Sequence, residues 1–158
     1  MRGLWLTGLR IDELRSLTWE ESTCYVDLKS RPPMIVFLGG QKNNSDSYLP
    51  APPEFWKLVG RGIEGYVCHV PGRRGQQMTT GRICRAISDI GERANVVVNK
   101  AGKTATAHDL RRAYITGIAA RATMSQAQQL ARHADPRTTA KHYIRHEAED
   151  LALKMGWA

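Results

Sequence analysis

One β-rich stretch, residues 24–50, lies between segments with helical patterns, and this order restricts the fold more than any other feature of the chain. Within it, Cys24–Leu28 alternates apolar and polar residues and Met34–Leu38 is a continuous apolar run, and both patterns are typical of strands. A third strand is expected at Ser47–Pro50, where the proline ends it. Turn-forming residues fill positions 39–45. We therefore predict a small antiparallel sheet with an exposed, polar hairpin tip.

The rest of the chain is expected to be helical. The expected helix starts are, in chain order, Thr7 or Gly8, Pro52 or Pro53, Thr79 or Thr80, Thr106 or Ala107, Ser125 and Asp135. In the helix that follows Thr80, the residues Ile83, Ile87 and Ile90 are placed on one apolar face. Residues 60–75 and 99–106 are rich in glycine and polar residues, which indicates loops. The prediction is an α+β fold that is mostly helical, with one three-stranded antiparallel sheet near the N-terminal end.

The chain of 158 residues has an ordinary globular composition but a strongly positive charge. It carries 23 Lys and Arg against 15 Asp and Glu, a formal net charge of +8. This balance is the electrostatic footprint of a nucleic-acid-binding protein, although a basic surface without a partner has the same composition. Cys24, Cys68 and Cys84 follow no CxxC spacing, which favours reduced thiols over a disulfide framework or a zinc site. Without a long apolar stretch or a signal-peptide pattern, we expect no membrane association and a cytoplasmic location.

Residue types suited to attack on a phosphodiester follow one another in a defined order. Arg10 lies near the start, His108 and Arg111 come about a hundred residues later, and His133 and Tyr143 lie near the end. Arginine forks bind phosphate oxygens in a bidentate way, histidines donate hydrogen bonds or protons, and tyrosine can be a covalent nucleophile. Because His108 and Arg111 are spaced i, i+3, one helix can present both to one site. The set indicates phosphoryl transfer without a metal.

Three boxes of the sequence resemble those of the tyrosine recombinases, the phage integrase family, over nearly the whole chain. They are Thr7–Leu14, His108–Arg112, and Leu130–Pro136 followed by Tyr143. The resemblance implies a catalytic domain that cleaves and rejoins double-stranded DNA at specific sites through a 3′-phosphotyrosyl intermediate. It implies no metal and no nucleotide cofactor, because the phosphotyrosine stores the bond energy. Since strand exchange joins two duplexes, a dimer or tetramer on DNA is expected.

The same resemblance gives each of these residues a role. Arg10 and Arg111 would clamp the non-bridging oxygens of the scissile phosphate and stabilise the pentacoordinate transition state. His133 would donate a hydrogen bond to a phosphate oxygen, and His108 would assist proton movement at the nucleophile. Tyr143 would attack phosphorus.

Further residues are expected to support these five. Lys42, at the expected hairpin tip, occupies the place of the family's catalytic lysine, which protonates the leaving 5′-hydroxyl; Lys29 competes for this role. Glu13 is expected to orient Arg10. Arg112 is an alternative to Arg111, although the spacing from His108 favours Arg111. The candidate contacts to the DNA backbone are Arg61, Arg73, Arg74, Arg82 and Arg85.

Three features depart from the family's pattern. Tyr143 follows His133 by ten residues, one more than the family pattern, which would place the nucleophile at His142. Arg132 stands where the family usually has a glycine before the histidine of the third box. The chain begins only nine residues before Arg10, so we expect residues 1–158 to be a catalytic domain truncated at its start, without the upstream DNA-binding domain.

Two other functions remain open from the sequence. One is a relic of the same fold that binds DNA but no longer cleaves it, and the other is a nicking enzyme similar to a type IB topoisomerase. Covalent adducts that depend on Tyr143 separate the enzyme from the relic, and site-independent relaxation of supercoiled DNA identifies the topoisomerase. Residues 144–158 either dock on a neighbouring subunit or fold back on their own core.

Overall fold

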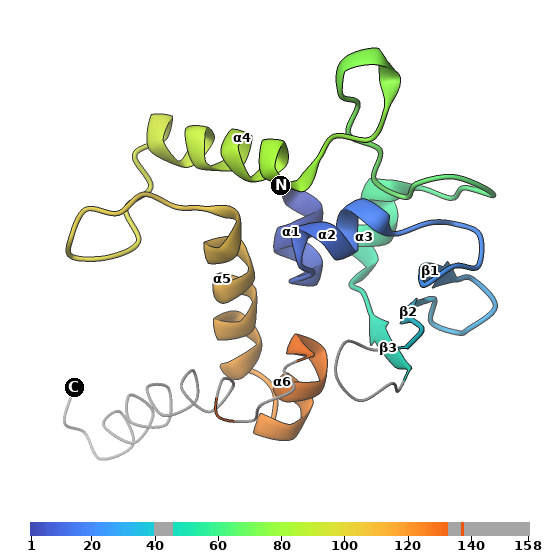
Figure 1. Cartoon of the computed structure of the whole chain (residues 1–158). Coiled ribbons are helices and arrows are strands. Elements are labelled where there is room, and N and C mark those ends of the chain that lie inside the picture. Colours follow the sequence, from blue (N-terminus) through green and yellow to red (C-terminus); the bar gives the residue numbers. More distant parts are fainter. Residues whose placement is uncertain (40–45, 133–136, 138–158) are drawn as a thin grey trace. The chain divides into compact units, whose positions relative to one another are not determined.

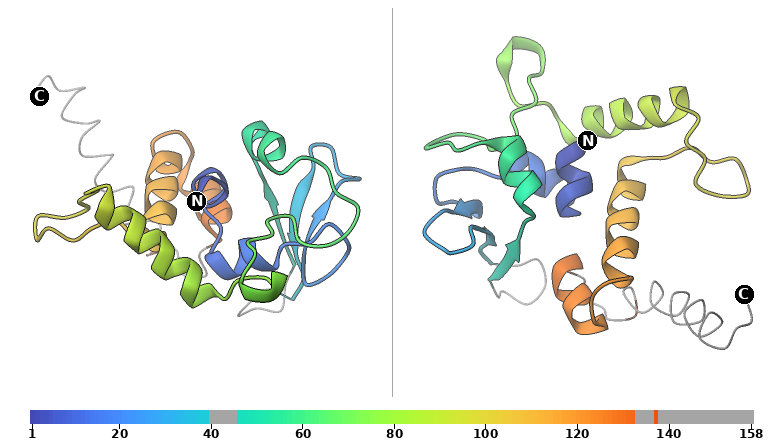
Figure 2. Two further views of the ribbon diagram at one scale, coloured as in Figure 1. Left: turned by 90° about the horizontal axis from the view of Figure 1, so that it is seen from above. Right: turned by 180° about the vertical axis from the view of Figure 1, so that it is seen from behind.

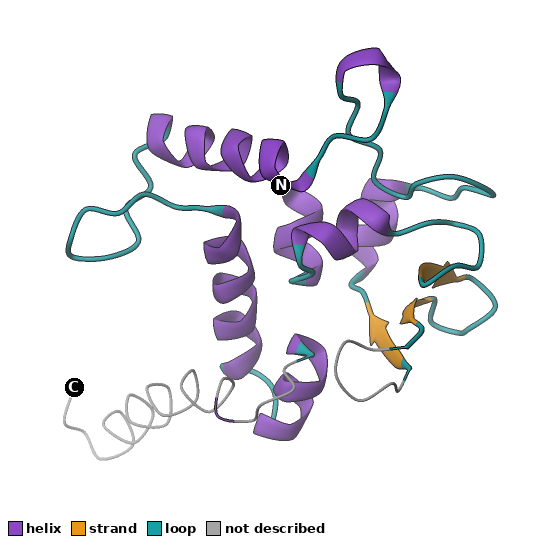
Figure 3. Ribbon diagram, viewed as in Figure 1, coloured by secondary structure: helices purple, strands orange, loops and turns teal. Residues whose placement is uncertain are grey.

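The computed structural model describes residues 1–39, 46–132 and 137 of the chain. The chain divides into two compact units, Met1–Arg111 and Arg112–Ala158. The described elements, in chain order, are α1 (Arg2–Thr7), α2 (Ile11–Ser16), β1 (Cys24–Asp27), β2 (Met34–Phe37), β3 (Ser47–Pro50), α3 (Pro53–Val59), a 3₁₀ turn (Arg73–Gly75), α4 (Thr80–Arg93), α5 (Ala107–Ala119) and α6 (Met124–Ala131) (Figure 1). Helices predominate and the strands lie together near the N-terminal end (Figure 3), so the predicted α+β class is confirmed.

The sheet in the first unit is antiparallel, with the strand order β1-β2-β3. The terminal pairs of its two ladders are Cys24↔Phe37 and Asp27↔Met34, then Met34↔Pro50 and Phe37↔Ser47. These strands match the predicted ones to within one residue at their ends. Ile35, Val36 and Leu49 are fully buried, so the apolar residues of the sheet contribute to the core of this unit.

The prediction that a helix opens at Thr7 or Gly8 is wrong, because a helix ends there. α1 closes with Gly8, whose φ of 62° is left-handed, a conformation that glycine adopts without the steric cost of a Cβ atom. The buried Thr7 hydroxyl donates to the Gly3 carbonyl at 2.7 Å and accepts from the Leu9 N–H at 3.3 Å. The chain therefore turns at Gly8, and helix resumes only at Ile11.

The helical core of the first unit joins α1, α4 and the start of α5. Leu4, Ile87 and Ala107 form its buried cluster. The placement of Ile90 on the buried face of α4 is wrong, because Ile90 is 39% exposed and Gly91 is buried in its place. Residues four apart share one helix face, so the buried ridge of α4 continues from Ile87 to Gly91. There the backbone of α4 lies directly against the carbonyl of Ala105.

The second unit contains the end of α5 and α6. Its buried cluster is Ile118, Ala119 and Ala127, with Tyr114 and Leu130 packed against it. This small apolar core joins the two helices.

The predicted cap of α6 at Ser125 is wrong, because Thr123 begins this helix. The Thr123 hydroxyl accepts from the Gln126 N–H at 3.3 Å, and the Gln126 carboxamide accepts from the Thr123 N–H at 2.9 Å. This reciprocal pair is a capping box, and it places Ser125 inside the first turn. The helix predicted from Asp135 lies outside the described residues. Of the helices that are described, none is long and apolar enough to cross a membrane.

Candidate phosphate-binding site

Arg10 is fixed at the surface by the first turn of α2. It is the N-cap of this helix, with an extended backbone. Its backbone N–H donates to Glu13 Oε2 at 2.8 Å, and its guanidinium Nη1 donates to Glu13 Oε1 at 2.8 Å. The Glu13 side chain is 7% exposed and the Arg10 side chain is 42% exposed. A buried carboxylate thus holds an arginine whose guanidinium faces solvent, the arrangement predicted for Glu13, whose part in catalysis remains a prediction.

Arg111 meets the same turn from the other end of the first unit. Its side chain is buried, and Nη1 donates to the carbonyl of Gly8, two residues before Arg10. A guanidinium carries five N–H donors in a rigid fork, and this bond uses one of them. The left-handed turn at Gly8, closed by Thr7, therefore sets the position of both arginines. Residues 101 positions apart in the sequence are brought to one turn.

The start of α5 is fixed by Asp109, which lies between the two predicted site residues of this helix. Its carboxylate Oδ2 accepts the Thr106 N–H at 3.0 Å and the Thr106 hydroxyl at 2.6 Å. Such reciprocal bonds define the first helical turn. His108 is exposed in that turn and Arg111 is buried one turn later. Because side chains three apart are neighbours on a helix, His108 lies at the solvent edge of the surface that carries Arg111. The exposed Arg112 lies in the second unit.

The two candidate lysines belong to different hairpin connections. Lys42 lies outside the described residues; in the sequence it is five residues after Phe37 and five before Ser47, the last pair of the β2–β3 ladder. Lys29 is exposed in the β1–β2 connection, where its N–H donates to Asp27 Oδ1 at 2.8 Å. The sheet therefore places the β2–β3 connection at the sequence position predicted for Lys42.

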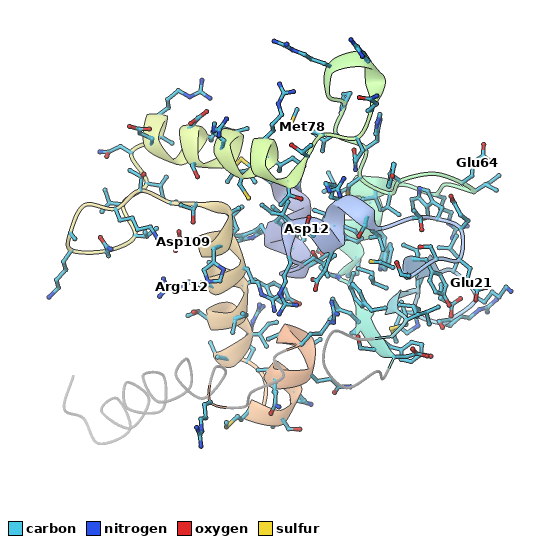
Figure 4. All side chains as sticks on the ribbon, in the orientation of Figure 1. Asp12, Glu21, Glu64, Met78, Asp109 and Arg112 are labelled. Carbon is cyan, nitrogen blue, oxygen red and sulfur yellow. The ribbon has the colours of Figure 1, made fainter. Side chains whose placement is uncertain are left out.

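His133 and Tyr143 also lie outside the described residues, as does the segment 144–158. The five arginines predicted to contact DNA are all exposed. Arg61 follows α3, Arg73 and Arg74 lie in the segment before α4, and Arg82 and Arg85 lie on α4. Figure 4 shows nitrogen-tipped side chains projecting outward from α4 and from the segment that precedes it. Exposure of this kind is what phosphate contacts require.

The sequence analysis missed the residues that build the turn between α1 and α2. Gly8 after the apolar run Leu4–Leu6 is a helix-stop signal, since glycine is strongly enriched just past a helix end. Recognised as such, it would have identified the turn. The hydroxyl of Thr7 carries no comparable signal, because its partners become neighbours only once the turn exists.

The fold is that of the tyrosine recombinases. XerA recombinase is similar, with a TM-score of 0.64 and 24% identity over 89% of this chain and 49% of that chain. The Tn1549 transposon integrase in complex with circular intermediate DNA has a TM-score of 0.63 and 21% identity over 95% and 58%. XerH site-specific recombinase bound to a palindromic difH substrate has a TM-score of 0.60 and 16% identity over 96% and 42%. The chain thus spans about half the length of these proteins.

The family assignment follows from the sequence as a whole. The model of the phage integrase family matches residues 1–150, and the chain belongs to this family. A search of curated proteins finds no match.

Arg132, which stands in place of the family's usual glycine, adopts the backbone conformation that favours glycine. It ends α6 with φ 50° and ψ 46°. A left-handed residue with a Cβ atom costs roughly 1–2 kcal/mol. We expect Arg132→Gly to be more stable than Arg132→Ala by about 1 kcal/mol, because both lose the side chain and only alanine keeps the steric cost. Chemical denaturation of the two variants measures this, and equal stabilities would contradict it.

Proposed function

We propose that this chain is the catalytic domain of a site-specific tyrosine recombinase, which cleaves and rejoins DNA strands through a 3′-phosphotyrosyl bond to Tyr143. The observation that carries the proposal is the convergence of Arg10 and Arg111 on the turn at Gly8. Two guanidinium groups at one turn suit a single phosphate with two non-bridging oxygens. Membership of the phage integrase family supports the same chemistry.

In the proposed cleavage step, the oxygen of Tyr143 attacks the scissile phosphorus. A bond forms between phosphorus and the tyrosine oxygen, and the bond between phosphorus and the 5′-oxygen breaks. Lys42 gives a proton to the leaving 5′-oxygen, and His108 assists the departure of the phenolic proton. Attack by the 5′-hydroxyl of a partner strand reverses the step and joins the new strands.

The proposed phosphate ligands stabilise the charge that develops during this step. Arg10 and Arg111 hold the non-bridging oxygens of the pentacoordinate transition state, and His133 donates a further hydrogen bond. Glu13 serves by keeping Arg10 in place at 2.8 Å. Because these groups are fixed before the reaction, little reorganisation is needed as charge builds up.

The proposed partner is double-stranded DNA, on which the protein acts as a dimer or tetramer in the cytoplasm. The net charge of +8 and the five exposed arginines suit binding to phosphates. The similar Tn1549 integrase and XerH recombinase are bound to DNA in their structures.

The test is the formation of a covalent adduct with a pool of nicked duplexes of random sequence, in which cleavage releases a short strand and traps the enzyme. The wild type is expected to give a DNA–protein band that survives denaturation. Tyr143→Phe should lose this band, and Tyr66→Phe, a matched change at an exposed tyrosine, should keep it.

Each other outcome of this test has a definite meaning. If the wild type retains the pool only without a covalent bond, the chain is a DNA-binding relic. If it forms adducts and relaxes supercoiled DNA without a specific site, the topoisomerase reading replaces the recombinase. An adduct that survives in Tyr143→Phe would show that another residue is the nucleophile.

A further inference from the structure

Residues 68–78, between α3 and α4, form a closed loop that carries two arginines at its tip. The Met78 N–H donates to the Val70 carbonyl at 2.8 Å, and the Gly72 N–H donates to the Gln76 carbonyl at 2.7 Å. An isolated bridge joins the same two legs nearer the tip. This green segment stands out from the helices of the first unit (Figures 1 and 2). It is a structured projection and not an irregular connection.

The tip of this loop has a conformation that its own sequence does not favour. Arg73 and Arg74 are both exposed, and Arg74 is left-handed with a φ of 65°. Outside glycine this conformation costs roughly 1–2 kcal/mol, and such strain persists only where the surroundings impose it. The bonds that close the loop therefore determine how the two arginines are presented.

Gln77 fastens the base of the loop to α2. Its Oε1 accepts the Val70 N–H at 2.8 Å, while its Nε2 donates to the Cys68 carbonyl at 2.9 Å and to the Arg15 carbonyl at 2.8 Å. Both donors and the acceptor of one carboxamide are thus satisfied. Burial at this base also raises the pKa of the Cys68 thiol. One uncharged side chain joins both legs of the loop to a helix that lies 62 residues earlier in the sequence.

Contacts on both sides of the loop tie its flanks to the same part of the chain. Before the loop, the Val67 N–H donates to the carbonyl of Leu17, just after α2, at 2.8 Å. After it, the Thr80 hydroxyl donates to the carboxylate of Asp12 in α2. Because α2 begins at Arg10, the attachment at Arg15 lies only about 8 Å farther along the helix. The loop and the candidate phosphate-binding turn are therefore parts of one framework.

We infer that the loop 68–78 is a preformed contact for the DNA phosphate backbone, and that Gln77 is the positioning residue that holds Arg73 and Arg74 at a fixed spacing from Arg10. The inference rests on the proposed function, since it gives the same DNA a second point of attachment away from the reacting phosphate. Contacts to phosphates fix the register of a protein on a duplex without reading its sequence. A loop fixed before binding also avoids the cost of ordering long side chains on the DNA.

The experiment measures the salt dependence of binding to a labelled duplex of arbitrary sequence, with the full chain. Each lost phosphate contact lowers the slope of log K against log salt by about 0.9. The double variant Arg73→Ala/Arg74→Ala is expected to lower it by about 2. Gln77→Met changes no charge and is expected to lower it by about 1 or more. Gln76→Met, the same change at the exposed neighbour, should leave it unchanged.

A double-mutant cycle separates positioning from a general loss of structure. If Gln77 acts through the two arginines, Gln77→Met should have no further effect in the Arg73→Ala/Arg74→Ala background. An equal loss in both backgrounds, or a wild-type slope in the double arginine variant, would overturn the inference. Should Gln77→Met fail to fold, Gln77→Asn keeps the carboxamide on a shorter stem and is expected to lower the slope in the same direction.

The two proposals fail independently. A slope that responds to the arginines, together with no adduct at Tyr143, removes the cleavage proposal and keeps the loop. Adduct formation with a slope that ignores the arginines does the reverse.

Discussion

Arg111→Lys is expected to lower the rate of covalent adduct formation by about 10²- to 10³-fold, the usual loss when one donor to a developing oxyanion is removed. Arg111 is buried and its fork is fixed by the bond to the Gly8 carbonyl. Lysine keeps the positive charge and can still donate to that carbonyl, but it has no planar fork for two phosphate oxygens. Alanine is a poorer probe, because an unpaired buried carbonyl costs about 1–3 kcal/mol.

The matched control for this prediction is Arg112→Lys. Arg112 is the next residue of α5 and is exposed, and the same substitution there is expected to change the rate by less than about 2-fold, as exposed side chains away from a site usually do. Melting temperatures of both variants show whether the fold is kept. If Arg112→Lys is the damaging change and Arg111→Lys is neutral, the roles of the two arginines are exchanged.

Gly91→Ala is expected to destabilise the protein by about 1–3 kcal/mol, the usual cost of an overpacked site. A Cβ atom at Gly91 would overlap the backbone carbonyl of Ala105, which has no rotamer by which to yield. Ala105 precedes α5 by two residues, so the strain falls on the segment that positions Arg111. We therefore expect a lower adduct rate together with a melting temperature lower by roughly 2–12 °C.

Gly81→Ala provides the control within the same helix. Gly81 lies in the first turn of α4 with open space around its Cβ position. Alanine is favoured over glycine in a helix by roughly 0.5–1 kcal/mol, so this variant should be equal to or more stable than the wild type. Thermal unfolding of the pair should show shifts of opposite sign. A shared sign would contradict the close approach of Gly91 to Ala105.

The sheet was predictable because each strand carries its own signal. The apolar run at Met34–Phe37 and the alternation at Cys24–Asp27 identify strands without reference to the rest of the chain. Turn formers between them leave only hairpin connections for strands so close in sequence. The observed strand order follows from these local facts.

The helix ends were harder to predict, because they depend on competing residues of similar chemistry. Thr123 and Ser125 are both good caps, and Gln126, three residues after Thr123, decides between them by bonding back to it. On α4, Ile90 and Gly91 are adjacent candidates for the buried ridge. Apolarity favours Ile90, but the close approach of the Ala105 carbonyl leaves room only for glycine.

The candidate site was predicted in its residue types but not in its geometry. The order of the boxes indicated that Arg10 and Arg111 belong together, yet no local pattern indicates that both are set by the carbonyl and the left-handed turn of Gly8. Gln77 carried no signal at all, because its partners lie in α2 and in the opposite leg of its loop. Contacts between distant segments are not encoded in local periodicity.

The most direct test of a shared phosphate site is a crystal structure of the chain with vanadate, which mimics pentacoordinate phosphorus. The expected result is one ion in contact with the guanidinium groups of both Arg10 and Arg111, with His133 and Tyr143 completing its surroundings. Ions bound separately to the two arginines, or an ion that contacts neither, would contradict a single phosphate site at the turn between α1 and α2.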